Sequence, residues 1–454
     1  MPPVFEVRST MAESYRSGLR RRAGRGRNFA NGTRDARKQT LSYIKVLMQV
    51  ANAPFGRYRE SMRRDDLDSE RRERLVPLPR WSGASALIPP LTPERLDLGR
   101  DDAVLWKAHE LIERLDGLVQ HLPEARLTTR TFERREAVRS SRIEGTRAEE
   151  SDLLRYEATG DEAGRSPDVA VTLNYVDALK HGIRVVAPRG REGLTRGLIS
   201  ELHARLMAGV EEYPDTPGEV RSVQVWVGGR TIYEATLVPP PPEAVPAALD
   251  DLVARLTGRP SPERPYEVSI VMRMAIAHAQ FEAIHPFRDG NGRVGRLIPP
   301  LMLVAEGSQP VYLAGALMRA RGDYNRLLAG VQLRGEWAPW VAFFAECVID
   351  GCSESIRLAK ELLALREGWL GRLSRVRSHA TARSLADELL GQPVVTAPLM
   401  ARRLGVSYRV ANGAVQTLVQ RGILTQRGDQ RRNRVFVASE VIEIIDRPPP
   451  DRFA

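Results

Sequence analysis

The sequence of 454 residues predicts a mainly α-helical protein with one β-hairpin in its middle and a small α+β domain at its C-terminal end. Three observations support this class. Apolar residues recur at helical spacing through most of residues 101–369. The spacing changes in residues 222–238, where β-branched and aromatic residues flank a Gly-Gly turn, a pattern typical of a hairpin. After residue 375, two helical patterns are followed by two short alternating runs.

The charge of the chain is uneven. The formal net charge is +11, and residues 1–80 alone hold 19 Lys and Arg against 9 Asp and Glu. Basic ends of this kind attract nucleic acid, although solvated arginine explains them equally well. With only two cysteines, Cys347 and Cys352, the sequence argues against a disulfide scaffold or a cysteine metal site. It holds neither a long apolar run nor a leader-like N-terminus, so we expect a cytoplasmic protein with no membrane partner.

The elements follow in order along the chain. We expect residues 1–80 to be a basic, disordered extension, because they contain few apolar residues. An extended, proline-rich segment leads into the first helix. Helical patterns are then predicted over residues 101–119, 131–147, 166–183, 195–210, 243–257, 265–283, 315–332 and 337–369, with a further helix starting near residue 292.

A short polar loop, His285-Pro-Phe-Arg-Asp-Gly-Asn-Gly-Arg-Val-Gly-Arg296, connects two of these helices. Gly290, Asn291 and Gly292 let backbone N–H groups approach an anion, and the N-terminus of the following helix favours negative charge. Arg293 and Arg296 are three residues apart and share one face of that helix, where two guanidinium groups suit a polyphosphate.

Two further side chains of the loop could do chemistry. Asp289 offers a hard oxygen ligand of the kind that Mg²⁺ takes when phosphates complete its shell. His285 lies at the mouth of the loop and has the pKa range of a general base. Each of these residue types has an ordinary structural explanation by itself, but their order within twelve residues is specific.

This loop resembles the signature of the Fic family, His-x-Phe-x-Asp/Glu-Gly-Asn-Gly/Lys-Arg-x-x-Arg, at every defined position. The resemblance extends over roughly residues 84–365. It implies a protein adenylyltransferase that moves AMP from Mg·ATP to a Ser, Thr or Tyr hydroxyl of a target protein or of itself. It also implies the following roles: His285 as the base, Asp289 on Mg²⁺, Gly290, Asn291 and Gly292 as an anion hole, Arg293 and Arg296 on phosphates, and Tyr324 near the adenine unless it is a core residue.

One position separates activities within the family. A phosphotransferase branch carries Lys where this sequence has Gly292, so the glycine favours AMP transfer over phosphate transfer. The sequence leaves open whether AMP is also removed from targets, and whether the protein is a homodimer. An alternative function is a DNA-binding transcriptional regulator whose Fic core senses nucleotide.

Two other segments acquire a meaning from the family. Residues 222–238 resemble its flap, a hairpin that aligns the target segment by strand addition, with Val225 and Ile232 as docking positions. Residues Ser140 to Gly145 resemble its inhibitory motif, Ser/Thr-x-x-x-Glu-Gly/Asn. The resemblance implies that Glu144 pairs with Arg296 and blocks the γ-phosphate position, with Ser140 on the same helix face. On this interpretation, residues 81–165 form a helical region with an inhibitory helix and residues 166–369 the catalytic core.

The C-terminal segment, residues 375–445, resembles a winged helix-turn-helix domain. Helices are predicted over residues 379–391, 396–405 and 408–422, with Ser407 as an N-cap. Alternating runs at 423–425 and 435–437 flank a basic turn. DNA is therefore a candidate partner. The candidate contacts are Tyr408, Arg409, Asn412 and Gln416 on the second helix of the motif and Arg431, Arg432 and Arg434 in the wing.

Overall fold

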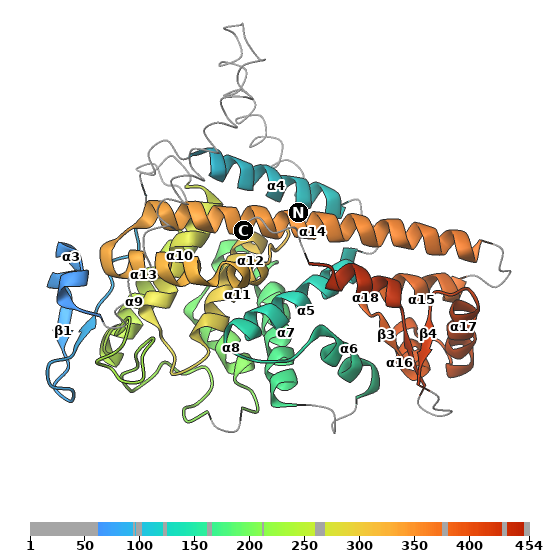
Figure 1. Ribbon diagram of the computed structural model, residues 1–454, viewed down its shortest axis with the longest axis horizontal. Coiled ribbons are helices and arrows are strands. Elements are labelled where there is room, and N and C mark those ends of the chain that lie inside the picture. The colour runs from blue at the N-terminus through green and yellow to red at the C-terminus, as the bar shows by residue number, and fades with distance from the viewer. Residues whose placement is uncertain are drawn as a thin grey trace, which may run out of the picture. The chain divides into compact units, whose positions relative to one another are not determined.

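The computed structural model describes residues 62–93, 96, 102–120, 125–160, 166–210, 213–258, 268–374, 380–428 and 434–448. The predicted extension up to residue 61 lies outside the described residues, as do Arg431 and Arg432 of the predicted wing. The mainly helical class predicted from the sequence is confirmed (Figure 1).

Residues 62–87 form ordered structure, unlike the disorder expected throughout residues 1–80. They contain the short helices η1 (Arg64–Asp66) and α3 (Ser69–Glu73) and the antiparallel strands β1 (Leu75–Pro77) and β2 (Ser85–Leu87). This small ribbon has too few apolar residues to fold alone. It gains burial from the 222–238 segment, because Leu78 and Ala86 pack with Ile232, Ala235 and Val238 in one apolar cluster.

The central part is a helical body around one large apolar core. Its largest buried side chains include Trp340, Phe281, Phe344 and Tyr175. The longest helix of this part, α14 (Trp337–Leu373), lies along α4 (Asp102–Gln120) (Figure 1). The helices of this part are α4 (Asp102–Gln120), α5 (Ala125–Ile143), α6 (Glu150–Thr159), α7 (Pro167–Val186), η3 (Gly190–Gly193), α8 (Arg196–Leu206), η4 (Pro242–Ala244), α9 (Val245–Thr257), α10 (Ile270–Ile284), α11 (Asn291–Ala305), α12 (Ala314–Arg319), α13 (Arg321–Arg334) and α14 (Trp337–Leu373).

Local sequence explains where several of these helices begin. Three N-caps are Ser166, Thr195 and Ser269, whose side chains accept hydrogen bonds from the backbone N–H of the third residue of α7, α8 and α10. Pro167 occupies the first position of α7, where the missing N–H of proline costs nothing. These caps set the start of the helices that carry and support the loop at residues 285–290.

The 222–238 segment folds back on itself, but it lacks the two regular strands predicted from its composition. One bridge joins Val227 and Leu237, with the Val227 N–H donating to the Leu237 carbonyl at 2.9 Å. Gly228 and Gly229 both adopt positive φ, at 73° and 68°, so the predicted turn is in place. Further pairing is replaced by contacts to the N-terminal ribbon, where the Leu87 N–H donates to the Val238 carbonyl at 2.9 Å.

The C-terminal elements surround a second apolar cluster that includes Leu389, Val415, Phe436 and Trp369. They are α15 (Ala380–Gly391), β3 (Val394–Val395), α16 (Ala397–Leu404), α17 (Tyr408–Gln420), β4 (Thr425–Arg427), β5 (Val435–Val437) and α18 (Ser439–Asp446). The strands form an antiparallel sheet in the order β3-β5-β4. Ser407 caps α17 as predicted. Strand β4 begins two residues later than expected, because Ile423 and Leu424 are buried in the cluster.

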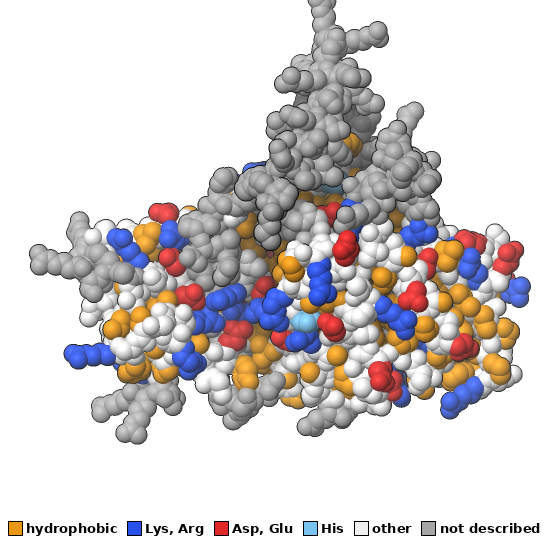
Figure 2. Space-filling view, turned by 180° about the vertical axis from the view of Figure 1, so that it is seen from behind, with side chains coloured by type: hydrophobic (Ala, Val, Ile, Leu, Met, Phe, Trp, Pro, Cys, Tyr) orange, Lys and Arg blue, Asp and Glu red, His pale blue; other side chains and the backbone are white. Residues whose placement is uncertain are grey.

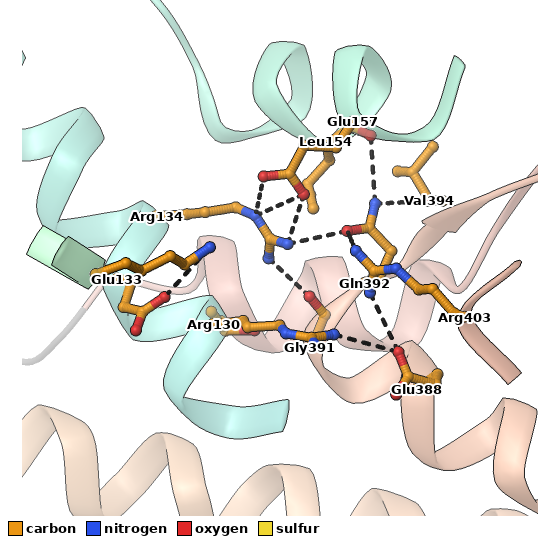
Figure 3. A network of polar contacts seen from close by, with 12 residues as sticks. Arg130, Glu133, Arg134, Leu154, Glu157, Glu388, Gly391, Gln392, Val394 and Arg403 are labelled. Carbon is orange, nitrogen blue, oxygen red and sulfur yellow. Dashed lines mark hydrogen bonds and ion pairs between the residues drawn. The ribbon is translucent and has the colours of Figure 1, made fainter. Parts of the chain in front are cut away.

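A buried polar network joins α5 and α6 to the C-terminal elements (Figure 3). Arg134 on α5 donates to both carboxylate oxygens of Glu157 on α6, to the Gly391 carbonyl at 2.7 Å and to Gln392 Oε1 at 2.9 Å. One turn earlier, Arg130 lies 3.3 Å from Glu388. We call this network, made of Arg130, Arg134, Glu157, Glu388, Gly391 and Gln392, the α5–C-terminal seam.

The surface mixes charges of both signs. On the face shown in Figure 2, Lys and Arg side chains gather near the middle with carboxylates and a histidine among them. Within the described ranges, none of the helices is both long and apolar enough to cross a membrane.

Candidate active site at the α10–α11 loop

The loop between α10 and α11 has a backbone shape that its residues impose. Helix α10 ends at His285, whose φ of 49° is the one positive value found for a non-glycine residue in the described part of the chain. Gly290, with φ of 80°, precedes the first residue of α11, Asn291. The Asn291 side chain holds the loop closed, because its Oδ1 accepts from the Phe287 N–H at 2.8 Å and its Nδ2 donates to the Phe287 carbonyl at 2.7 Å.

The left-handed backbone at His285 is supported from outside the loop. Arg221 donates from Nε to the His285 carbonyl at 2.9 Å, and its backbone N–H donates to the Pro286 carbonyl at 3.0 Å. Residues held in such sparsely populated backbone regions cluster at functional sites, because the surrounding structure must stabilise them.

The His285 imidazole is largely buried but keeps contact with solvent. Its Nδ1 lies 3.4 Å from the Glu282 carbonyl oxygen. Since a carbonyl can only accept, this contact places a proton on Nδ1 and leaves the Nε2 lone pair free. Burial lowers the pKa of His285 to about 4, with a smaller lowering by Arg221, so the ring is neutral near pH 7. A neutral imidazole with a free nitrogen can accept a proton.

Arg296 is buried and bound by the end of α5. Its Nε donates to Ser140 Oγ at 2.8 Å, and its Nη2 donates to the Ser140 carbonyl at 3.0 Å and to Glu144 Oε1 at 2.5 Å. Burial would lower the pKa of Arg296 and raise that of Glu144, but their mutual attraction outweighs burial and shifts both in the opposite direction. The structure thus brings Ser140 and Glu144 to Arg296, which lies 156 and 152 positions away in sequence.

The Glu144 carboxylate lies directly against Gly292. A Cβ atom added at Gly292 would overlap Glu144 Oε1 and would lie 3.0 Å from Arg296 Nη1. Any side chain at this position would therefore compete with the Glu144 carboxylate for the same space. The glycine at the first turn of α11 is needed for the Glu144–Arg296 pair to form as it does.

The two other polar residues of the loop differ in exposure. The Asp289 side chain is 70% exposed, whereas Arg293 is buried, with its Nη2 3.5 Å from Asp289 Oδ2. The Nε of Arg293 is buried and has no hydrogen-bond partner. Across the described segments, no three His, Cys, Asp or Glu side chains lie together as a ready-made metal site. Asp289 is an isolated carboxylate that could hold a cation only with ligands from elsewhere.

Tyr324 lies in the core of the site. It is buried, and its hydroxyl hydrogen-bonds His278 Nε2 at 2.9 Å, while His278 Nδ1 contacts the Gly295 carbonyl at 3.0 Å. Together they tie α10, α11 and α13 to one another below the loop.

The predicted flap positions differ from each other. Val225 is partly exposed, but Ile232 is 5% exposed and packs against the N-terminal ribbon. The exposed apolar side chains of this segment are instead Trp226 and Tyr233, together with Val223. Ile232 was expected to be a docking position, but the ribbon of residues 62–87 covers it.

The candidate DNA contacts in the described part of the C-terminal region lie on α17 and before β5. Tyr408 and Arg409 are exposed at the start of α17. Arg434 donates to Asn412 Oδ1 at 3.0 Å and stacks over the Phe436 ring.

Three residues that support the site were not found by sequence reasoning. His203 on α8 stacks on Phe287 with ring centroids 3.8 Å apart, accepts from the Gly218 N–H at 2.8 Å and contacts the Asp289 carbonyl at 3.1 Å. Arg221 supports His285, as described above. Glu282 is a buried carboxyl one turn before His285. His203 and Arg221 come from distant segments with no motif of their own, and Glu282 has the spacing of an ordinary helical residue.

Family models match the two segments that carry this site. Residues 103–184 match the family model described as Fic/DOC family N-terminal, and residues 193–303 match the one described as Fic/DOC family. The first segment contains Ser140 and Glu144, and the second contains the loop of residues 285–296. These two segments are therefore similar to the Fic/DOC family.

Curated relatives match over part of their length. The chain is 30% identical over 184 residues to "Protein adenylyltransferase Fic" of Culex quinquefasciatus, which covers 40% of this chain and 33% of that protein. It is 33% identical over 148 residues to "Protein adenylyltransferase fic-1" of Caenorhabditis elegans, covering 33% of this chain and 26% of that protein. The chain thus spans about a third or less of the length of these relatives. A solved structure of Fic-1 from C. elegans is 25% identical with a TM-score of 0.46, covering 57% of this chain and 73% of that one.

Proposed function

We propose that this chain is a protein adenylyltransferase that transfers AMP from ATP to a hydroxyl group of a protein. The observation that carries the proposal is the loop itself, where a neutral histidine, an exposed carboxylate and a helix N-terminus with two buried arginines meet. The printed names of the curated relatives support the same activity.

The residues have roles that follow from their geometry. Backbone N–H groups at Gly290, Asn291 and Gly292 begin α11 and would bind the phosphates of ATP, helped by Arg293. His285 Nε2 takes the proton of the acceptor hydroxyl as its oxygen attacks the α-phosphorus. The bond from the α-phosphorus to the bridging oxygen breaks, and pyrophosphate leaves. The protein therefore contributes positioning and charge stabilisation, and it forms no covalent bond to the substrate.

The family implies Mg²⁺, and the residues present fit it. Asp289 offers a carboxylate that is mostly exposed and bound only weakly by Arg293, at 3.5 Å. Mg²⁺ is commonly held by one or two carboxylates and the substrate phosphates, so a single aspartate is sufficient. When bound, the ion neutralises phosphate charge.

We further propose that the end of α5 inhibits the enzyme. The Glu144 carboxylate occupies Arg296, which is therefore unavailable to the γ-phosphate of ATP. Because the Glu144 side chain is 41% exposed, it can leave without opening the core. Inhibition of this kind is reversible and depends on a single carboxylate.

The C-terminal elements support DNA binding as a second role beside the transfer of AMP. We propose that α15 to β5 form a winged helix-turn-helix domain, since their order and the β3-β5-β4 sheet suit that fold. Exposed Tyr408 and Arg409 on α17 are its candidate DNA contacts. A gel shift with genomic fragments tests this role, and shifting without any transfer of AMP would favour the regulator over the enzyme.

The central test follows label from ATP onto protein. Glu144→Gly is expected to raise labelling from α-³²P ATP with no labelling from γ-³²P ATP, and His285→Ala in that background is expected to abolish labelling while ATP still binds. Glu149→Gly, which removes an exposed carboxylate five residues away, is the matched control and should leave labelling unchanged. Labelling only from the γ-phosphate would overturn AMP transfer. Mass spectrometry of a labelled lysate would then identify the acceptor hydroxyl.

A further inference from the structure

The carboxyl group of Glu282 is buried beside the proposed base. Glu282 is in the last turn of α10 and is 7% exposed. Its Oε2 lies 3.9 Å from His285 Nδ1. Its Oε1 is buried and has no hydrogen-bond partner. An unpartnered buried carboxyl costs stability, so its presence needs an explanation other than folding.

The packing around Glu282 leaves room for this carboxyl and for little else. A Cβ atom added at Gly295 would overlap Glu282 Oε1 and would lie 3.2 Å from the Phe281 ring. Glycine at 295, on the second turn of α11, therefore accommodates the carboxyl against the helix backbone. Among the residues that the structure describes, Glu282 caps no helix and its Oε1 has no hydrogen-bond partner, so no structural role accounts for it.

The charged and titratable groups that face Glu282 come from four elements. Arg296 is on α11, Glu144 follows α5, His285 ends α10, and Tyr324 is on α13. Burial raises the pKa of Glu282 to about 7, with an opposing effect of Arg296 and a supporting one of Glu144. Both protonation states are therefore accessible near neutral pH, and a positive charge on His285 would favour the ionised one.

We propose that Glu282 is a positioning residue for His285, which orients the imidazole through Nδ1 and stabilises the imidazolium formed when Nε2 accepts the hydroxyl proton. This inference rests on the proposed AMP transfer. A carboxylate on the far nitrogen of a catalytic histidine acts in this way in other enzymes, and such contacts tighten when substrate binds. The proton remains on Nε2 while pyrophosphate leaves, and the Nδ1 proton stays in place throughout.

The test compares the Glu144→Gly variant, here called the parent, with the double variant that also carries Glu282→Gln. Loss of the negative charge is expected to lower kcat by roughly 10- to 100-fold. KM for ATP should not change, because Glu282 touches no phosphate site. The acid limb of kcat against pH should move to lower pH, because it reflects the ionisation of Glu282 near pH 7 in the parent and of His285 at lower pH in the variant. Glu282→Asp, which keeps the charge, should restore the acid limb and part of kcat.

Glu136→Gln is the matched control, because Glu136 is also a buried carboxyl of the same core but accepts from the Ala314 N–H instead of facing His285. It should leave the acid limb where it is. An unchanged kcat and acid limb in Glu282→Gln would overturn the proposal, as would an equal shift in Glu136→Gln. If Glu282→Gln does not fold, a Glu282→Asp variant with the full kcat of the parent overturns it instead, because the shorter side chain holds its carboxylate farther from His285 Nδ1. Absence of labelling in the Glu144→Gly parent itself would mean that the proposed function, and not the role of Glu282, has failed.

Discussion

Replacing Arg134 by alanine should detach α5 and α6 from the C-terminal elements. The Arg134 side chain is 4% exposed and pairs with Glu157, which is 20% exposed. It also donates to the Gly391 carbonyl and to Gln392 Oε1. In the alanine variant, three acceptors lose a charged donor in a mostly buried place (Figure 3).

The magnitude follows from this burial. Removing one partner of a buried ion pair costs about 3–5 kcal/mol, and the partial exposure of Glu157 reduces this to about 2–4 kcal/mol. Arg130, one turn earlier on the same helix, provides the comparison. Its side chain is 35% exposed and has one ion-pair contact at 3.3 Å, to Glu388, so Arg130→Ala should cost about 0.2–1 kcal/mol.

Hydrogen exchange followed by mass spectrometry measures the difference locally. Peptides from α6 and α15 in Arg134→Ala should exchange roughly 30- to 700-fold faster than in wild type, because each 1.4 kcal/mol of local opening is about tenfold. Peptides from α10 and α11 should change little. The same slight acceleration in Arg134→Ala and Arg130→Ala would refute the view that Arg134 holds the seam.

Two other predictions concern charge. Asp289→Asn should abolish the Mg²⁺-dependent gain in ATP affinity measured by calorimetry, with metal-free ATP binding retained; a Mg²⁺ effect of unchanged size would remove Asp289 from the metal site. Burial raises the pKa of Glu136 to about 7 from 4.5. The folded state therefore holds a proton that the unfolded chain has lost, so Glu136 makes the free energy of unfolding fall as pH rises from 4.5 to 7. Urea unfolding of Glu136→Gln should show a shallower fall over that range than wild type, and an equal slope would contradict the assignment.

Sequence reasoning was strongest where the chemistry is local. The order of residues 285–296 was enough to predict a helix, a loop and a new helix, and α10 and α11 meet at that loop. Apolar periodicity likewise predicted most of the helical body. The resemblance of residues 140–145 to the inhibitory motif also implied that Glu144 pairs with Arg296, 152 residues away, and the two side chains are in contact.

Sequence reasoning was weaker where burial depends on distant segments. Nothing in the spacing of Ile232 shows that residues 62–87 cover it, so the 222–238 segment was expected to be a freer and more regular hairpin. Arg221 and His203 support the loop from other parts of the chain and carry no pattern. Glu282 is one polar residue within the helical pattern of α10, and the sequence around it forms no motif. Its possible role becomes visible only in the folded protein, where its Oε1 is buried without a hydrogen-bond partner.

The length of α14 limits how this protein can be divided. Its N-terminal half supplies Trp340 and Phe344 to the central core, and its C-terminal end supplies Trp369 and Leu373 to the second cluster. A helix of 37 residues extends about 56 Å as one piece, so no flexible joint separates the two cores along this path. A fragment that stops before Trp369 would strip the C-terminal cluster of its largest side chain. If the C-terminal elements move relative to the loop at residues 285–290, α14 must therefore either rotate as one rigid helix or unwind at its C-terminal end.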